Sequence, residues 1–361
     1  MTEPPVHSRR RGASELTILD VAEAAGVSSA SVSNLLNGRF DRMRPGTRTR
    51  IEAAIKELDY RPNPVARHLK TGRAPMLGLM VRTVANPFYG ELATALERIA
   101  EAKGYHLLLC NSLRDRDSER AFAEKIAAMG VRGLICCSGT GEPGQFDEYV
   151  SRGISVVAFD VDAGDPASEG TDRVSIDNEA ATRLAVDHLV SLGHRTIAYV
   201  SATARTPNRK ARLRGYEEGM AAHGLGSGPR YVDCAKPGFS PYRDVDHGEL
   251  GRLAGRHMAA CVPRPTAIVA MNDAIAIGLM AGLGDCGLAV PEDVSVVGLD
   301  DIQFAALVRP GLTTIRQPLP YLAQKAVEHL LARLAEPDRP PSACIAKAEL
   351  IVRGSTAPPA I

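Results

Sequence analysis

Hydrophobic residues recur at helical spacing in three short segments near the start of the chain. In the first segment, Thr17 and Asp20 have the spacing of a capping box, and Gly26 permits a tight turn after it. Ser28 then caps a second segment with its own apolar face. A third segment carries the apolar residues Ile51, Ala54, Ile55 and Leu58. The pattern predicts a helix-turn-helix head over residues 15–61, whose second helix is free to enter a DNA major groove.

A fourth helical signal follows the head. Asn63 is a good N-cap and Pro64 is favoured at the first helical position, so a helix is expected within residues 62–74. This helix has only about seven residues, below the roughly 12–15 needed for stability alone in water. We therefore expect it to fold only when a partner orders it.

From Met76 onward the pattern changes to short apolar runs that alternate with helical segments. The first series of runs covers residues 76–81, 105–110, 133–137 and 154–159. After Asp177 the rhythm repeats, with a helix to Leu192 and runs at 196–200, 230–234, 266–271 and 294–299. The helices between the later runs are expected at 212–223, up to 260, and at 273–285. This alternation predicts α/β structure with parallel sheets in two lobes over residues 75–361. Ligands bind beyond the carboxyl ends of such strands, here in the cleft between the lobes.

The motifs of the head resemble those of one known family. Residues 17–33 read T-x-x-D-V-A-x-x-A-G-V-S-x-x-x-V-S, and residues 57–70 read E-L-x-Y-x-P-N-x-x-A-R-x-L-K. Both resemble the lactose-repressor (LacI/GalR) family of bacterial transcription regulators. The resemblance implies a helix-turn-helix head, a hinge helix, and a two-lobed effector domain similar to periplasmic sugar-binding proteins.

The resemblance also implies roles for residues of the second helix and the hinge. Bases would be read by Ser29, Ala30 and Asn34, while phosphates would be held by Ser28, Ser31 and Ser33. In the hinge, Leu69 would wedge between base pairs in the minor groove, with Ala66 and Lys70 beside it.

Two positions depart from the family pattern. Arg44-Pro45 stands where the family usually places Ser or Thr before the third helix, so the side-chain cap is expected to be missing. Asn34 stands where relatives often carry Arg. An Asn side chain suits the N6/N7 edge of adenine, whereas Arg suits guanine, so we expect a different base preference.

In the effector domain, the resemblance places Arg212, Asn272 and Asp300 at ligand-holding positions, and Asp160 follows another strand. An arginine fork, an amide and a carboxylate suit vicinal hydroxyls. Helix capping is the alternative for Asp300 and for Asp273, because each stands just before a helical segment. Two further candidates come from the first lobe: Asn86, which could instead cap a helix, and Tyr89, which with Phe88 could stack on a ligand. The family's lobes exchange strands, which we expect near Asp160–Asp177, Asp300 and Gln317.

Charge is unevenly distributed along the chain. The net charge is +1, but residues 1–75 hold 13 Lys/Arg and 8 Asp/Glu, which leaves the remainder net acidic. A basic head suits nucleic acid, and residues 1–14, rich in Pro and Arg, are expected to be a disordered leader. Seven scattered cysteines, no secretory signal and no membrane-length apolar run favour a cytoplasmic protein. The expected assembly is a homodimer through the effector lobes. No leucine heptad follows Pro337, so a coiled-coil tetramer is not expected.

One motif suggests an enzyme instead. Residues 139–144 spell G-x-G-x-x-G after a strand, with Asp160 about twenty residues on, as in dinucleotide-binding enzymes. However, the strand is the third of its lobe, and Pro143 removes an amide where phosphate would bind. We find no nucleophile–base pair, no metal-ligand spacing and no cofactor motif that requires catalysis. The sequence predicts a ligand-responsive DNA-binding repressor with a sugar-like effector. A solute-binding module, an activator, or an NAD-linked enzyme are the alternatives.

Overall fold

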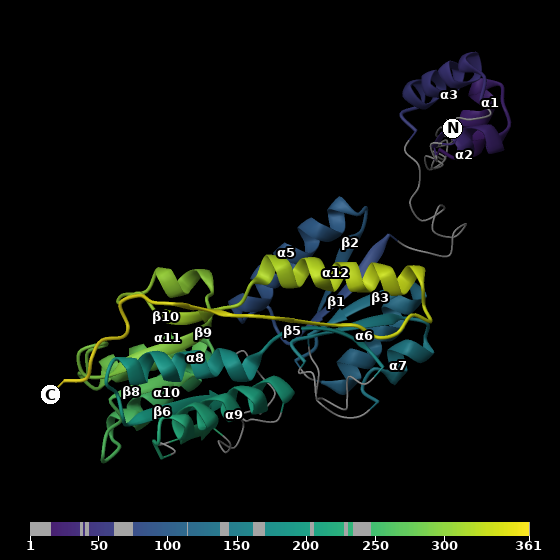
Figure 1. Cartoon of the computed structure of the whole chain (residues 1–361). Coiled ribbons are helices and arrows are strands. Elements are labelled where there is room, and N and C mark those ends of the chain that lie inside the picture. Colours follow the sequence, from purple (N-terminus) through teal and green to yellow (C-terminus); the bar gives the residue numbers. More distant parts are fainter. Residues whose placement is uncertain are drawn as a thin grey trace, which may run out of the picture. The chain divides into compact units, whose positions relative to one another are not determined.

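The structure is a computed structural model of the whole chain. It describes residues 16–36, 39, 43–60, 75–113, 115–137, 144–161, 170–202, 206–226, 230–233 and 247–360. The chain divides into two compact units, residues 1–73 and residues 74–361 (Figure 1).

The first unit contains the three helices of the head, α1 (Ile18–Ala25), α2 (Ser29–Leu36) and α3 (Pro45–Glu57). Val21, Val32 and Ile51 are fully buried at the centre of its core. Gly26 ends α1 in the left-handed region at φ 61°, where an L side chain would be strained. The predicted helix-turn-helix is therefore confirmed.

The helix ends of the head also follow the sequence. Asp20 accepts hydrogen bonds from the backbone amide of Thr17 at 2.6 Å and from its hydroxyl at 2.7 Å. The hydroxyl of Ser28 accepts from the amide of Ser31 at 3.3 Å, at the start of α2. α3 begins after Arg44 without a side-chain cap, as predicted, and has proline in its first turn.

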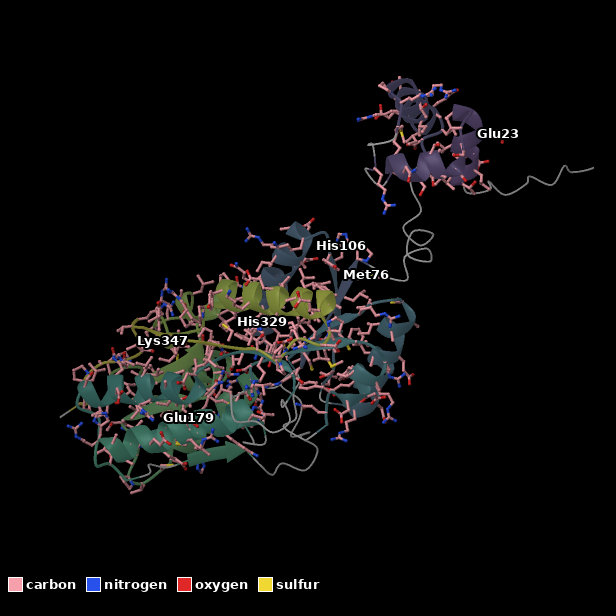
Figure 2. The ribbon with its side chains drawn as sticks, turned by 45° about the vertical axis from the view of Figure 1, so that its right-hand side comes forward. Glu23, Met76, His106, Glu179, His329 and Lys347 are labelled. Atoms are coloured by element: carbon pink, nitrogen blue, oxygen red, sulfur yellow. The ribbon has the colours of Figure 1, made fainter. Side chains whose placement is uncertain are left out.

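The second unit begins with a lobe built on a parallel six-stranded sheet in the order β11-β5-β4-β3-β1-β2. Its strands are β1 (Met76–Val81), β2 (His106–Asn111), β3 (Gly133–Cys136), β4 (Ser155–Phe159), β5 (Asp172–Ile176) and β11 (Ala343–Ala346). Met76 pairs with His106 at the start of β1 and β2 (Figure 2). The helices of this first lobe are α5 (Pro87–Ala102), α6 (Arg116–Ala128), α7 (Asp147–Ser151) and α12 (Leu319–Ala335).

The second lobe repeats this plan. Its sheet has the order β12-β10-β9-β8-β6-β7, and only the edge strand β12 runs antiparallel among these six. The strands are β6 (Ile197–Ala202), β7 (Arg230–Asp233), β8 (Ala267–Ala270), β9 (Ser295–Asp300), β10 (Thr313–Arg316) and β12 (Glu349–Ile351). The helices are α8 (Asn178–Ser191), α9 (Pro207–Ala222), α10 (His247–Ala259), α11 (Asp273–Asp285) and the short 3-10 helix η3 (Gln303–Ala306).

The chain passes between the two sheets three times. The passages follow β5 near Asp177, follow β10 near Gln317, and lie between β11 and β12. The expected passage near Asp300 is wrong, because β9 and β10 are neighbours in one sheet. The long helix α12 packs on α5 and on strands β3, β4 and β5, so the C-terminal segment completes the first lobe before it returns to the second (Figure 1).

Two helices of the second lobe pack with their backbones in direct contact. A Cβ atom at Gly278 of α11 would lie 1.9 Å from the carbonyl oxygen of Gly248 on α10. A Cβ atom at Gly251 of α10 would lie 2.1 Å from the carbonyl oxygen of Ile275. Glycine is therefore required at these positions. The close packing of α10 against α11 depends on steric fit as well as on hydrophobic burial.

Candidate ligand pocket and DNA-reading helix

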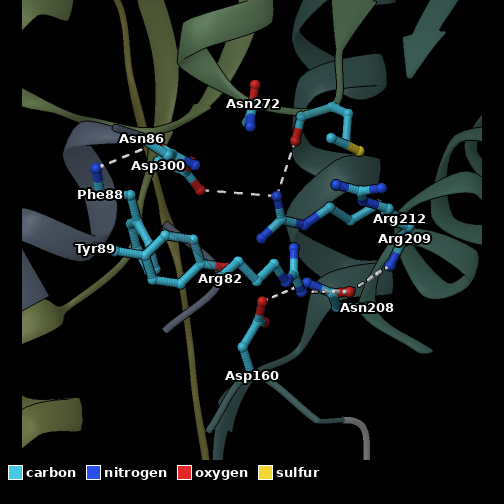
Figure 3. A pocket seen from close by; sticks show the side chains of 11 residues that line it. Arg82, Asn86, Phe88, Tyr89, Asp160, Asn208, Arg209, Arg212, Asn272 and Asp300 are labelled. Atoms are coloured by element: carbon cyan, nitrogen blue, oxygen red, sulfur yellow. Dashed lines mark hydrogen bonds and ion pairs between the residues drawn. The ribbon is translucent and has the colours of Figure 1, made fainter. Parts of the chain in front are cut away.

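A polar pocket lies where strands of both lobes end. Arg82 follows β1 and Asp160 follows β4 in the first lobe, while Asn272 follows β8 and Asp300 ends β9 in the second. Carboxyl ends of parallel strands meet at one sheet edge, so side chains distant in sequence converge there. All six residues predicted for the effector line this pocket (Figure 3): Asn86, Tyr89, Asp160, Arg212, Asn272 and Asp300.

The pocket is small and mostly polar. Its cavity volume is about 20 Å³, roughly the room that one water molecule needs. Phe88 and Tyr89 form one apolar wall, with ring centroids 5.4 Å apart in a T-shaped arrangement. The lining suits a hydrophilic ligand, for which the pocket would have to widen.

Arg212 is held by groups from three segments. Its Nε donates to the side-chain oxygen of Asn178 at 2.7 Å, and its Nη1 donates to the carbonyl oxygen of Met271 at 2.8 Å. The same Nη1 lies 3.7 Å from the carboxylate of Asp300. Because the guanidinium is almost completely buried and bonded on two sides, it presents a fixed fork to the pocket (Figure 3).

The two pocket carboxylates both sit on strained backbone. Asp160 has φ 60° and Asp300 has φ 131°, and such conformations cluster at functional sites. Gln317 donates to Asp300 at 2.8 Å. Burial raises the pKa of Asp300 well above its usual range, although the nearby Arg212 guanidinium opposes the shift. Asp160 accepts from the side-chain amides of Asn178, at 3.3 Å, and Asn208.

The helix-capping alternatives are resolved by the hydrogen bonds. The side-chain oxygen of Asn86 caps α5 by accepting from the amide of Phe88 at 3.2 Å. Asn272 caps α11 in the same way, accepting from Ile275 at 2.9 Å. In each asparagine the oxygen is used by the cap, which aims the amino group away from the helix start. The amino group of Asn272 contacts Nδ1 of His247 at 3.0 Å.

Asp273 does not cap α11. Its carboxylate accepts from the backbone amide of Ile302 at 2.9 Å and from the hydroxyl of Thr314 at 2.5 Å. Burial, assisted by the charge of Asp301, raises its pKa to about 7. Asp273 therefore joins α11 to β10 and to the segment after β9, behind the pocket wall.

Sequence reasoning missed three polar residues of the pocket. Arg82 donates to the side-chain oxygen of Asn208 at 3.4 Å and lies over the ring of Tyr89 at 5.9 Å. Asn208 and Arg209 lie one turn before Arg212 on α9. The sequence pattern predicted a helix from Arg212, whereas the helix begins at Pro207. A proline favoured at the first helical position was the signal that could have found them.

The residues of the head predicted to contact DNA lie in α2 or directly before it. Ser28, Ala30 and Asn34 are exposed, and Ser29, Ser31 and Ser33 are half-buried, while Val32 faces the head core. The hinge residues Ala66, Leu69 and Lys70 lie outside the described residues, as does most of the G-x-G-x-x-G segment. No described helix is long and apolar enough to cross a membrane.

Comparison with known proteins matches both units. Residues 17–63 match the bacterial regulatory proteins of the lacI family, and residues 186–356 match the periplasmic binding protein-like domain. The chain is 32% identical to the HTH-type transcriptional repressor PurR of Aliivibrio fischeri (strain MJ11), over 94% of this chain and 98% of that protein. It is 32% identical to the ribose operon repressor of Escherichia coli (strain K12), over 89% of this chain and 94% of that protein.

A solved structure agrees over both units. The crystal structure of the lac repressor dimer bound to operator and the anti-inducer ONPF matches with a TM-score of 0.80 and 25% sequence identity. The match covers 95% of this chain and 100% of that chain. The predicted fold class, a helix-turn-helix head followed by a two-lobed periplasmic-binding-protein-like domain, is confirmed.

Proposed function

Because the chain belongs to the LacI family of bacterial regulatory proteins, we propose that it is a ligand-responsive transcriptional repressor that binds operator DNA as a homodimer. One observation carries the ligand-responsive part of this proposal. Six residues predicted from separate segments surround one buried polar pocket. The relatives named above are repressors rather than NAD-linked enzymes, so the dinucleotide alternative receives no support from them. A chromosomal operator implies a cytoplasmic protein.

For DNA recognition, we assign base contacts to Ser29, Ala30 and Asn34 and phosphate contacts to Ser28, Ser31 and Ser33. Their position along α2, with Val32 turned into the core, supports this assignment. Phosphate contacts position a protein on DNA, whereas contacts to base edges specify the sequence. Two heads of a homodimer would read the two halves of a pseudo-palindromic operator.

For the effector, we propose a sugar or sugar derivative held by the six predicted pocket residues. Arg212, Asn272 and Asp300 supply a fork, an amide and a carboxylate that suit neighbouring hydroxyls. The polar lining of the pocket supports a ligand of this kind. The relative named as the ribose operon repressor is consistent with a sugar effector.

The proposed link between ligand and DNA is the hinge segment at residues 62–74. Its helix is encoded with too few residues to stand alone, so its folding can depend on how the lobes hold it. Ligand binding that changes the arrangement of the two lobes would shift this folding equilibrium of the hinge. The coupling free energy between effector binding and DNA binding is typically about 1–3 kcal/mol. The dimer would form through the effector lobes. The lac repressor structure is itself that of a dimer bound to operator.

A gel shift with an operator selected from random DNA tests the hinge assignment. We expect Leu69→Ala to weaken specific binding at least tenfold, because the minor-groove wedge is lost. Leu184→Ala, at an exposed position of α8, is the matched control and should bind like the wild type. Unimpaired operator binding by Leu69→Ala would exclude the hinge role.

A thermal-shift screen tests the pocket assignment. Sugars, sugar acids and nucleobases are added to the wild type and to Arg212→Gln, which removes the fixed fork of the pocket. A compound that stabilises the wild type should lose most of its effect on the variant. If every stabilising compound acts equally on both proteins, its site lies elsewhere.

A further inference from the structure

Three guanidinium groups converge on the pocket. Arg82 comes from the first lobe, whereas Arg209 and Arg212 come from successive turns of α9 in the second lobe (Figure 3). The three residues are 6%, 2% and 5% exposed. Removing a charge from water is costly, so three buried cations at one small pocket call for a functional explanation.

Two carboxylates line the same pocket, and both accept hydrogen bonds from side-chain amides. The oxygens of Asp160 accept from the side-chain amides of Asn178 and Asn208. Asp300 accepts from the side-chain amide of Gln317. Among the described lining residues, three positive groups therefore face two carboxylates.

Helix ends add to the positive side. α5, α9 and α11 all begin at the pocket, where Asn86, Asn208 and Asn272 lie at or near their first turns. The N-terminal end of a helix carries partial positive charge and favours anions. Here three such ends act together with the buried arginines, so the potential in the pocket favours negative charge.

Arg82 of the first lobe contacts the second lobe at Asn208, the residue before Arg209. The guanidinium of Arg209 lies 3.5 Å from Nε2 of His247. The oxygen of Asn208 accepts from Nη2 of Arg82 at 3.4 Å and from the backbone amide of Arg209 at 2.9 Å. We propose that the effector is a small hydroxylated compound with an anionic group, a carboxylate or a phosphate, held between Arg82 and Arg209. This inference rests on the proposed function, whose ligand it specifies.

The anionic group would also explain how the ligand acts on the lobes. Arg82 belongs to one lobe and Arg209 to the other, so their like charges oppose close approach of the lobes. An anion between them turns this repulsion into two charge-assisted contacts that span the cleft. Ligand binding would then favour the closed arrangement through a force that a neutral sugar cannot supply.

Inorganic phosphate is the first probe, titrated against sodium chloride at equal ionic strength and followed by thermal shift and calorimetry. We expect phosphate to bind the wild type and to stabilise it more than chloride does. Arg82→Gln and Arg209→Gln should each weaken phosphate binding about tenfold or more. Arg82→Lys keeps the charge but loses the planar fork, so it should retain part of the binding.

Matched hexoses then separate the ligand classes: D-glucose, D-glucuronate and D-glucose 6-phosphate. We expect at least one anionic hexose to bind tighter than D-glucose, and expect Arg82→Gln to remove that advantage. Arg98→Gln, on the exposed face of α5, is the control and should leave all titrations unchanged. Melting of each variant without ligand shows that it is folded.

The outcomes distinguish this inference from the proposed function. If phosphate binds no better than chloride, or binds equally to the wild type and both glutamine variants, the anionic class is overturned. Tighter binding of D-glucose than of both anionic hexoses overturns it as well, and leaves a neutral effector in the same pocket. If Arg212→Gln changes none of the bound compounds, the pocket itself is not the effector site, and the proposed function fails at that point.

Discussion

The head and the pocket are built in opposite ways. The core of the head comes from residues 18–60, and its helix ends are fixed by neighbours three positions apart, such as Thr17 with Asp20. The pocket joins Arg82 to Asp300 through side chains from both lobes and several strand ends. The motif of the head can therefore be recognised from residues close together in the sequence. The pocket, by contrast, exists only after two sheets have formed.

Stability follows the same division. The head has one small cluster of buried residues, so a single cavity removes a large share of its stability. The second unit has an extended core around two sheets, where steric fit between helices matters more than one apolar group. A substitution in one unit should therefore leave the other unit undisturbed.

The largest effect is expected in the head. Ile51 is fully buried, and Ile51→Ala should lower the free energy of unfolding of the head by about 4 kcal/mol. This loss is close to the whole folding stability of a domain of this size. The head of the variant should therefore be largely unfolded and operator binding should disappear, while the second unit melts as in the wild type. Leu19→Ala, at a residue 65% exposed, should leave head stability nearly unchanged. Calorimetry and amide NMR of the full chain separate the two units.

A steric substitution tests the second unit. In Gly278→Ala the new methyl group would lie 1.9 Å from a carbonyl oxygen of α10, so the helices must separate. We expect a loss of about 3 kcal/mol in the second unit and none in the head. Gly284→Ala in the same helix meets no atom within 4 Å and should be neutral or stabilising. Equal effects of the two substitutions would contradict the close helix packing.

Asp273 and Asp20 should contribute to the pH dependence of their units in opposite directions. The pKa of Asp273 is raised to about 7 by burial, so its protonated form favours folding. That stability is full below about pH 4 and is lost as pH rises towards 7. The pKa of Asp20 is lowered by its hydrogen bonds from Thr17, so the head gains from ionised Asp20 above about pH 4 and loses this as pH falls.

Unfolding of the wild type and of Asp273→Asn between pH 4 and 8 measures this difference. The variant should show a smaller decline of second-unit stability with rising pH, apart from a constant offset for the altered hydrogen bonds. Part of the decline should remain, because burial also raises the pKa of Asp300 in the same unit. The same slope in both proteins would show that Asp273 does not carry the pH dependence.

The smallest effect is expected at a helix cap. Ser28→Ala removes the hydroxyl that accepts from the amide of Ser31, which should cost the head about 1 kcal/mol. The melting transition of the head, resolved from that of the second unit, measures this loss of stability. Ser29→Ala, one residue later and inside the helix, is the control for loss of a serine hydroxyl.

The sequence specified the head nearly completely, because capping, turn and apolar spacing are local. It also located the six pocket residues, from strand ends, from the start of the first helix of the first lobe, and from the family resemblance. It did not show their partners: the contacts of Asn208 with Arg82 and Asp160 depend on how the lobes pack. Nor did it show the passage between β11 and β12, whose short edge strands carry little apolar pattern.

The most direct test of the account is selection of binding sites from random DNA by three proteins. The wild type and Arg212→Gln should select the same two-fold symmetric operator, because sequence choice resides in the head. Asn34→Arg should change one symmetric position towards guanine and keep the rest of the site, because Arg suits the O6/N7 edge of guanine. An unchanged site for Asn34→Arg, or an altered site for Arg212→Gln, would contradict the division of roles between head and pocket.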